Sequence, residues 1–234
     1  MLLMKNGLIT MIKNENKQYI EDFSIHCQDL SYIINEIIID KFPGPLIGLG
    51  HSMGGHLLLL YQEREQNKFS SLILSAPMLG FKYERVLFFI ATMIKNFANK
   101  ENYFFLSKPN MGKETPFTQN DLTSDYERYT RTQRLVRKLP KIRLWGVTNA
   151  WICAAKDSFI KIRKKTWAKK IETPIYIVNP LNDKVVSSDK TIEMAKKLKN
   201  CKVFNISNCE HEILMEKDQL RNQFWNIFDN YMTK

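Results

Sequence analysis

The chain has 234 residues, 44% of them hydrophobic, which is enough for one globular domain with a substantial core. Its formal net charge is +11, but the basic residues are spread along the chain without a nucleic-acid-binding signature, so we expect no nucleic-acid partner. The four cysteines have no CxxC spacing, and neither a metal-ligand cluster nor a glycine-rich phosphate loop occurs. We therefore expect reduced thiols, a cytoplasmic location and no metal or cofactor.

The N-terminal region is predicted to hold little regular structure. Residues 1–22 are polar and irregular, and the first clear element is a helix over 29–39. Five apolar residues recur there at helical spacing and indicate one buried stripe: Leu30, Ile33, Ile34, Ile37 and Ile38.

The most informative motif is GHSMG at 50–54. It matches Gly-x-Ser-x-Gly, the pattern of a nucleophile elbow, in which a strained strand-to-helix turn exposes a serine hydroxyl. A short apolar strand is predicted over 45–49, and a helix is predicted around 57–61. Glycine on both sides of Ser52 suits a turn whose backbone segments come too close for a side chain. The sequence therefore predicts Ser52 as a nucleophile.

A nucleophilic serine needs partner residues. In folds that carry a nucleophile elbow, these partners follow the serine along the chain in the order acid, then histidine. Of the four histidines, only His211 lies well downstream of Ser52, and it follows a predicted strand over 202–206. Asp183 follows another predicted strand, which begins near 173. Because functional groups gather at the carboxyl ends of strands in open α/β sheets, we expect these three side chains to meet there.

Other interpretations of the polar residues stay open. Asp183 also suits a turn cap, and Asp189 is the second candidate acid, although it is expected to begin a helix over 190–198. His51 and His56 are expected to be packing or hydrogen-bonding residues. Cys209 lies near the catalytic histidine candidate, but no elbow surrounds it, so we do not expect a cysteine nucleophile.

A long insertion over 79–165 separates the elbow region from the strand near 173. It contains an apolar helix over 85–95, too short to span a bilayer, and a charged helix within 124–138. The apolar helix is interpreted either as ordinary core or as a lipid-facing lid. We divide the chain into 1–78 with the elbow, a helical cap over 79–165, and 166–234 with the acid and the histidine.

Four segments carry a resemblance that extends over nearly the whole chain: GHSMGG at 50–55, SAPM at 75–78, LTSDYERY at 122–129 and HEILMEKD at 211–218. The chain resembles bacterial lysophospholipases and monoacylglycerol-lipase-like serine hydrolases of the α/β-hydrolase superfamily, of the serine aminopeptidase S33 type. The last two segments are more specific than the elbow and favour the lysophospholipase branch.

The resemblance implies an α/β-hydrolase fold with a mostly parallel sheet and an inserted helical cap. It also implies a serine ester hydrolase of lysophospholipid or monoacylglycerol-like substrates, with no cofactor. Ser52 would be the nucleophile, His211 the general base and Asp183 the group that orients it, through an acyl-enzyme. The backbone amide of Met53 would be one donor of the oxyanion hole.

The chain departs from the family pattern before the elbow, where the first strands and the His-Gly loop with the second oxyanion donor are missing. We therefore expect an N-terminally truncated fold with one unpaired sheet edge. The alternative function is a catalytically impaired remnant, or a split-protein fragment that associates with a complementary N-terminal chain. The positive charge also suits peripheral contact with an anionic inner membrane, although solvated lysines explain it too.

Overall fold

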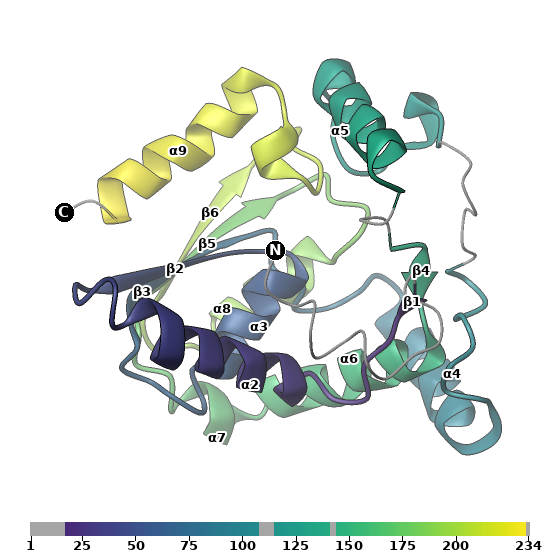
Figure 1. Ribbon diagram of the computed structural model, residues 1–234, viewed down its shortest axis with the longest axis horizontal. Helices are drawn as coiled ribbons and strands as arrows, with labels where there is room; N and C mark the ends of the chain where they lie inside the picture. Colours follow the sequence, from purple (N-terminus) through teal and green to yellow (C-terminus); the bar gives the residue numbers. More distant parts are fainter. Residues whose placement is uncertain (1–16, 108–114, 141–143, 233–234) are drawn as a thin grey trace. The chain divides into compact units, whose positions relative to one another are not determined.

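The structure of the protein is a computed structural model that describes residues 17–107, 115–140 and 144–232 (Figure 1). The chain forms two compact units that alternate along the sequence. One unit comprises 1–43, 83–115 and 132–161, and the other comprises 44–82, 116–131 and 162–234. The domain boundaries that the sequence predicts after residues 78 and 165 stay a prediction.

The second unit is built around a four-stranded sheet in the order β2-β3-β5-β6, with every neighbouring pair parallel. The strands are β2 (Leu46–His51), β3 (Phe69–Ser75), β5 (Ile175–Pro180) and β6 (Cys201–Ile206). The central residues of the two inner strands, β3 and β5, are apolar and buried, as in a parallel sheet covered on both faces. Because the strands are parallel, the loops that follow β2, β5 and β6 all lie at the carboxyl ends of the strands.

Helices cover both faces of this sheet: α3 (Met53–Tyr61) and α8 (Ser188–Ala195) lie on one side and α9 (Asp218–Met232) on the other (Figure 1). Every residue of α3 from 55 to 61 is buried, which explains its nearly continuous apolar sequence. A buried cluster extends from the sheet to α9 and consists of Ile73, Ala76, Val178, Ile206, Cys209, Ile213 and Phe224. The mostly parallel α/β architecture predicted from the sequence is confirmed.

The first unit is mainly helical. Its elements are α2 (Ser24–Ile33), the π-turn η1 (Ile34–Ile38), α4 (Glu84–Phe97) and most of α6 (Asn149–Ile162), and a short pair joins β1 (Lys17–Gln18) to β4 (Gly146–Val147). The remaining elements are η2 (Phe117–Gln119), α5 (Tyr126–Lys138), which continues from one unit into the other, α7 (Lys165–Ala168) and η4 (Ile213–Met215).

The helix predicted over 29–39 differs from the observed one. The observed α2 begins at Ser24, whose backbone N–H donates to the Asp22 carboxylate at 2.7 Å, and after Ile33 the chain continues as the wider π-turn. A π-turn departs from the 3.6-residue period, so the apolar residues no longer share one face. The predicted buried stripe is therefore wrong in detail, since Ile34 is buried but Ile37 is exposed.

The apolar helix predicted over 85–95 is confirmed as α4. Of its residues only Ala91 is buried, whereas the side chains of Val86, Phe89 and Phe97 are exposed. Ordinary core packing therefore does not account for most of the apolar side chains of this helix.

β2 lies at one edge of the sheet and, within the described ranges, pairs only with β3. Its side chains Ile47 and Leu49 are 38% and 43% exposed, which is unusual for the elbow strand of a parallel sheet. The edge position agrees with the unpaired edge that the sequence predicts. Residues 1–16, which belong to the region predicted to be irregular, lie outside the described ranges.

Candidate active site

Ser52 occupies a strained turn between β2 and α3. Its φ of 51° and ψ of −118° lie in a sparsely populated region for a residue with a side chain. A Cβ on Gly50 would stand 2.8 Å from the Gly54 carbonyl oxygen, so only glycine fits there. The Ser52 carbonyl accepts backbone N–H groups from His56 and Met78, at 3.2 and 2.9 Å, and these bonds hold the turn.

The structure brings the three predicted triad residues together at the carboxyl ends of the strands. Nε2 of His211 lies 2.9 Å from Oγ of Ser52, and its Nδ1 lies 2.7 Å from Oδ2 of Asp183. Ser52 follows β2, Asp183 follows β5 and His211 follows β6. The side chains of His211 and Asp183 are almost completely buried, which shields the contact from water and strengthens it.

Asp183 serves two purposes with its two carboxylate oxygens. Oδ1 accepts the backbone N–H groups of Val185 and Val186, at 2.7 and 2.9 Å, as in a turn cap. Oδ2 faces the His211 imidazole. The turn that follows β5 therefore fixes the carboxylate whose other oxygen faces the ring.

The other candidates lie elsewhere or are chemically unsuited. Asp189 is in the first turn of α8, as the sequence predicts. Burial, with the nearby Glu216, Asp183 and Glu210 carboxylates, raises the pKa of Cys209 to about 12, so its thiol stays protonated near neutral pH.

His56 is a buried packing residue. Burial, together with the positive charge of Arg163, lowers its pKa to about 3, against the opposing effect of a hydrogen bond to the Met78 backbone. The ring is therefore neutral at pH 7, in agreement with the packing role predicted from the sequence.

Met53 begins α3 directly after Ser52, the predicted nucleophile. The first N–H groups of a helix have no partner within the helix, so such an amide can bind a developing oxyanion. The oxyanion role of Met53 stays a prediction.

Sequence reasoning missed a buried carboxylate that organises the histidine loop. Oε1 of Glu216 accepts the Glu210 backbone N–H at 2.9 Å, and Oε2 accepts the Ser124 hydroxyl at 2.6 Å. Arg128 of α5 donates to the Glu216 backbone carbonyl and pairs with Asp218. Both of the more specific resemblance segments contribute to this network, and their charged residues were the available signal.

Sequence reasoning also missed a second imidazole–carboxylate pair. Nε2 of His51 lies 3.3 Å from Oε2 of Glu212, and the His51 and His211 ring centroids are 4.9 Å apart. Nδ1 of His51 lies 3.4 Å from the Ser75 hydroxyl. The two residues that adjoin Ser52 and His211 in sequence are thus also neighbours in space.

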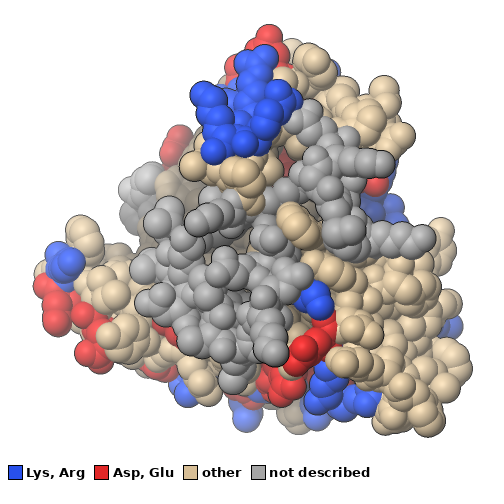
Figure 2. All heavy atoms as spheres, turned by 45° about the vertical axis from the view of Figure 1, so that its right-hand side comes forward, with Lys and Arg blue, Asp and Glu red and all other residues tan. Residues whose placement is uncertain are grey.

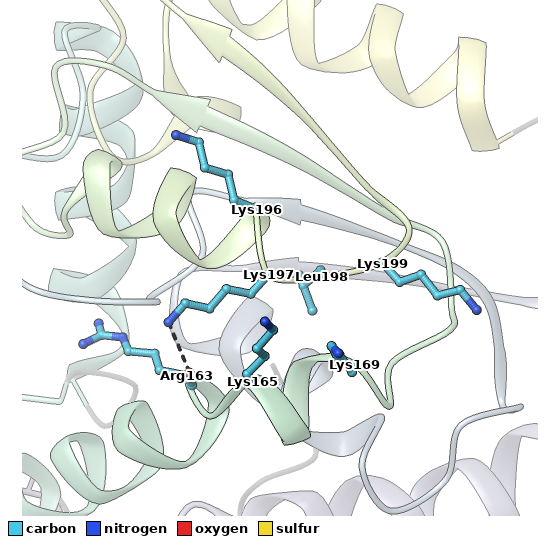
Figure 3. A pocket seen from close by; sticks show the side chains of 7 residues that line it. All are labelled: Arg163, Lys165, Lys169, Lys196, Lys197, Leu198 and Lys199. Carbon is cyan, nitrogen blue, oxygen red and sulfur yellow. Dashed lines mark hydrogen bonds between the residues drawn. The ribbon is translucent and has the colours of Figure 1, made fainter.

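A basic hollow of about 640 Å³ lies at the opposite ends of β5 and β6 (Figure 3). Nζ of Lys197 donates to the Arg163 backbone carbonyl at 3.1 Å, and Lys199 pairs with Glu172 at 3.4 Å. In the part of the chain that the structure describes, Lys165, Lys169 and Lys196 have no carboxylate partner. The lining residues are Arg163, Lys165, Lys169, Lys196, Lys197, Leu198 and Lys199.

The described ranges contain no group of three or more His, Cys, Asp or Glu side chains placed to hold a metal ion. No helix in them combines the length and apolarity that a bilayer crossing requires.

A parallel sheet covered by helices on both faces, a serine on a strand-to-helix elbow, and the chain order serine, aspartate, histidine together define an α/β-hydrolase. The chain belongs to the serine aminopeptidase S33 family, whose family model matches residues 13–218.

Several known proteins are similar to it. The probable lysophospholipase L2 of Haemophilus influenzae is 24% identical over 218 residues, which is 92% of this chain and 68% of that protein. Lysophospholipase L2 of Escherichia coli is 28% identical over 184 residues, which is 74% of this chain and 53% of that protein. The match thus spans between about half and two thirds of the length of these relatives.

Solved structures agree on the fold. The monoacylglycerol lipase of Paleococcus ferrophilus superposes with a TM-score of 0.68 at 15% identity, covering 89% of this chain and 74% of that one. At this identity the likeness establishes the α/β-hydrolase fold and nothing further. The fold class predicted from the sequence is confirmed.

Proposed function

We propose that this chain carries the catalytic residues of a serine ester hydrolase that acts on lysophospholipid or monoacylglycerol-like esters. The observation that supports this most is the continuous contact from the Ser52 hydroxyl through His211 to Asp183, at 2.9 and 2.7 Å. The similarity to the two lysophospholipases L2 favours a lipid ester over other acyl substrates.

The proposed mechanism follows from these contacts. Nε2 of His211 accepts the Ser52 proton as Oγ attacks the ester carbonyl, and it returns that proton to the leaving alcohol. Water then attacks the acyl-enzyme with the same imidazole as base, which releases the fatty acid. Asp183 holds the ring in the tautomer that leaves Nε2 free to accept, and it stabilises the imidazolium.

The tetrahedral intermediates need donors for the oxyanion. We assign one donor to the backbone N–H of Met53, and each such donor contributes on the order of 3 kcal/mol to lowering the barrier. The second donor has no assignment within the described ranges. We therefore expect this chain alone to hydrolyse esters more slowly than an enzyme with both oxyanion donors.

The alternative is an impaired remnant or a split fragment that needs a complementary N-terminal chain. The similarity to known hydrolases does not favour this alternative. The edge position of β2, with Ile47 and Leu49 exposed, is the observation that supports it.

A fluorophosphonate probe tests the proposal, because it labels only an activated serine. We expect labelling of the chain by itself, its loss in Ser52→Ala and its retention in Ser70→Ala, an exposed serine at the start of β3. The unchanged chain and Ser70→Ala should release fatty acid from lysophosphatidylcholine or monooleoylglycerol, and Ser52→Ala should not. Labelling only after addition of the N-terminal third of the Escherichia coli relative would favour the split protein. No Ser52-dependent labelling in either arm would contradict the proposed hydrolase and the split protein, and would favour the catalytically impaired remnant.

Peripheral contact with an anionic inner membrane, and a cytoplasmic location, stay predictions. The basic hollow supports the membrane contact, since lysines near an anionic surface are each worth about 1 kcal/mol.

A further inference from the structure

We propose that Glu212 and His51 form a second carboxylate–imidazole pair that positions the catalytic imidazole and supplies negative charge beside it. The pair lies against the ring of His211, whose Nδ1 and Nε2 are already engaged by Asp183 and Ser52. This inference rests on the proposed function, since it describes how the same site is tuned.

The contacts of the His51 ring show which group each of its nitrogens faces. Nε2 of His51 is buried without a hydrogen bond among the described residues, and Oε2 of Glu212 lies 3.3 Å from it. At 3.3 Å the contact is long for a hydrogen bond, so its attraction is mainly electrostatic. A proton on Nε2 of His51 faces the Glu212 carboxylate, and Nδ1 lies 3.4 Å from the Ser75 hydroxyl.

A backbone hydrogen bond holds the main chain of Glu212 in place. Its N–H donates to the Leu122 carbonyl at 2.7 Å, directly beside the buried histidine. Burial alone would raise the pKa of Glu212, but the contact with His51 and the charges of His51 and His211 lower it on balance. The carboxylate is thus ionised at neutral pH.

The other titratable groups around the two rings either belong to the triad or have partners of their own. Oδ2 of Asp183 is directed at His211. Glu210 pairs with the lysine that follows Asp183, and Glu216 accepts backbone and hydroxyl donors. Cys209 stays protonated because its pKa is raised to about 12. Glu212 is therefore the carboxylate whose removal changes the charge next to the His51–His211 pair without breaking the triad.

The sign of the effect follows from Coulomb attraction. A negative charge near an imidazole favours its protonated form and raises its pKa. Glu212→Gln removes the charge and keeps the shape, so the acid limb of the pH profile of kcat/KM should move down by about half to one pH unit. The plateau of kcat/KM should fall about 3- to 10-fold, because the imidazolium-like transition state loses the same stabilisation.

Three variants separate this role from a structural one. Glu212→Asp keeps the charge and should restore most of the acid limb. Glu172→Gln removes an equal charge from the pair with Lys199 near the amino ends of β5 and β6, and it should leave the pH profile of kcat/KM unchanged. In a His51→Gln background, Glu212→Gln should cost less than it does alone, since the two residues act together. Thermal unfolding of each variant checks that it is folded.

An NMR titration of the His211 ring gives a readout that does not depend on turnover. The pKa of that ring should be lower in Glu212→Gln than in the unchanged protein by about half to one unit. An unchanged ring pKa and an unchanged acid limb would overturn the proposal. If the ring pKa shifts but no Ser52-dependent hydrolysis is seen, the proposed function fails while the electrostatic pairing stands.

Discussion

At the scale of residues, the site depends on the two oxygens of one carboxylate. The sequence leaves Asp183 open as a turn cap or as the orienting acid, and in the structure it is placed for both. Oδ1 accepts two backbone amides and Oδ2 faces His211. Since each ionised oxygen accepts separately, the turn holds the acid without competing for it.

Asp183→Asn tests this arrangement. The amide oxygen can still accept from Val185 and Val186, so the melting temperature should change little. The amide NH₂ would face Nδ1 and favour the wrong His211 tautomer, which in a serine-protease triad lowers kcat about 10⁴-fold. We expect a loss of about 10³- to 10⁴-fold in ester hydrolysis. Asp189→Asn in α8 is the matched control, and an equal loss there would contradict the assignment.

At the scale of elements, the sequence predicts best where one local rule acts alone. β5, β6 and the elbow helix are found where apolar runs and turn residues place them. The helix before the elbow is misjudged because a π-turn shifts the hydrophobic period, and no residue pattern announces that insertion. The contacts of Glu216 and Glu212 were missed because both join segments that are distant in sequence.

His56 of α3 gives a stability prediction with a definite sign. Its pKa is about 3 in the folded chain, lowered mainly by burial, and near 6.5 when unfolded. The unfolded state therefore binds a proton that the native state does not, and stability falls as pH drops from about 6.5 toward 3. Between pH 7 and 5 this residue should contribute a loss of about 2 kcal/mol in the free energy of unfolding.

His56→Gln should remove that part of the pH dependence, as measured by urea unfolding at several pH values. His26 is also buried with a lowered pKa, so His26→Gln removes only its own contribution and serves as the comparison. A slope unchanged by His56→Gln would show that another group is responsible.

At the scale of the whole molecule, one group of basic side chains is gathered in the hollow, and other basic side chains lie among acidic ones (Figure 2). Figure 2 shows acidic side chains beside basic ones on the face it draws. Within the second unit, the triad lies at the carboxyl ends of the strands and the basic hollow at the amino ends of β5 and β6. Binding at the hollow is therefore expected to be independent of ester hydrolysis.

Anionic vesicles test the hollow directly. A Lys165→Glu, Lys196→Glu double variant should bind phosphatidylglycerol vesicles about tenfold or more weakly in a co-sedimentation assay, since each basic residue near the surface is worth about 1 kcal/mol. Hydrolysis of a soluble ester should be unchanged. Lys41→Glu with Lys82→Glu makes the same charge change at exposed positions outside the hollow. Equal losses for both pairs would show that net charge alone sets the binding.

The sequence by itself determined the fold class, through its strand pattern and family resemblance, and it singled out the elbow and the three residues that we propose as the triad, because glycine sterics, strand periodicity and chain order are local or ordered properties. Only the tertiary structure decided which groups meet at the ends of the strands. The 2.9 and 2.7 Å contacts of His211, the buried Glu216 and the Glu212–His51 pair all depend on β2, β5 and β6 lying in one parallel sheet. Such contacts join residues up to 161 positions apart (212 − 51), and no local pattern encodes that distance.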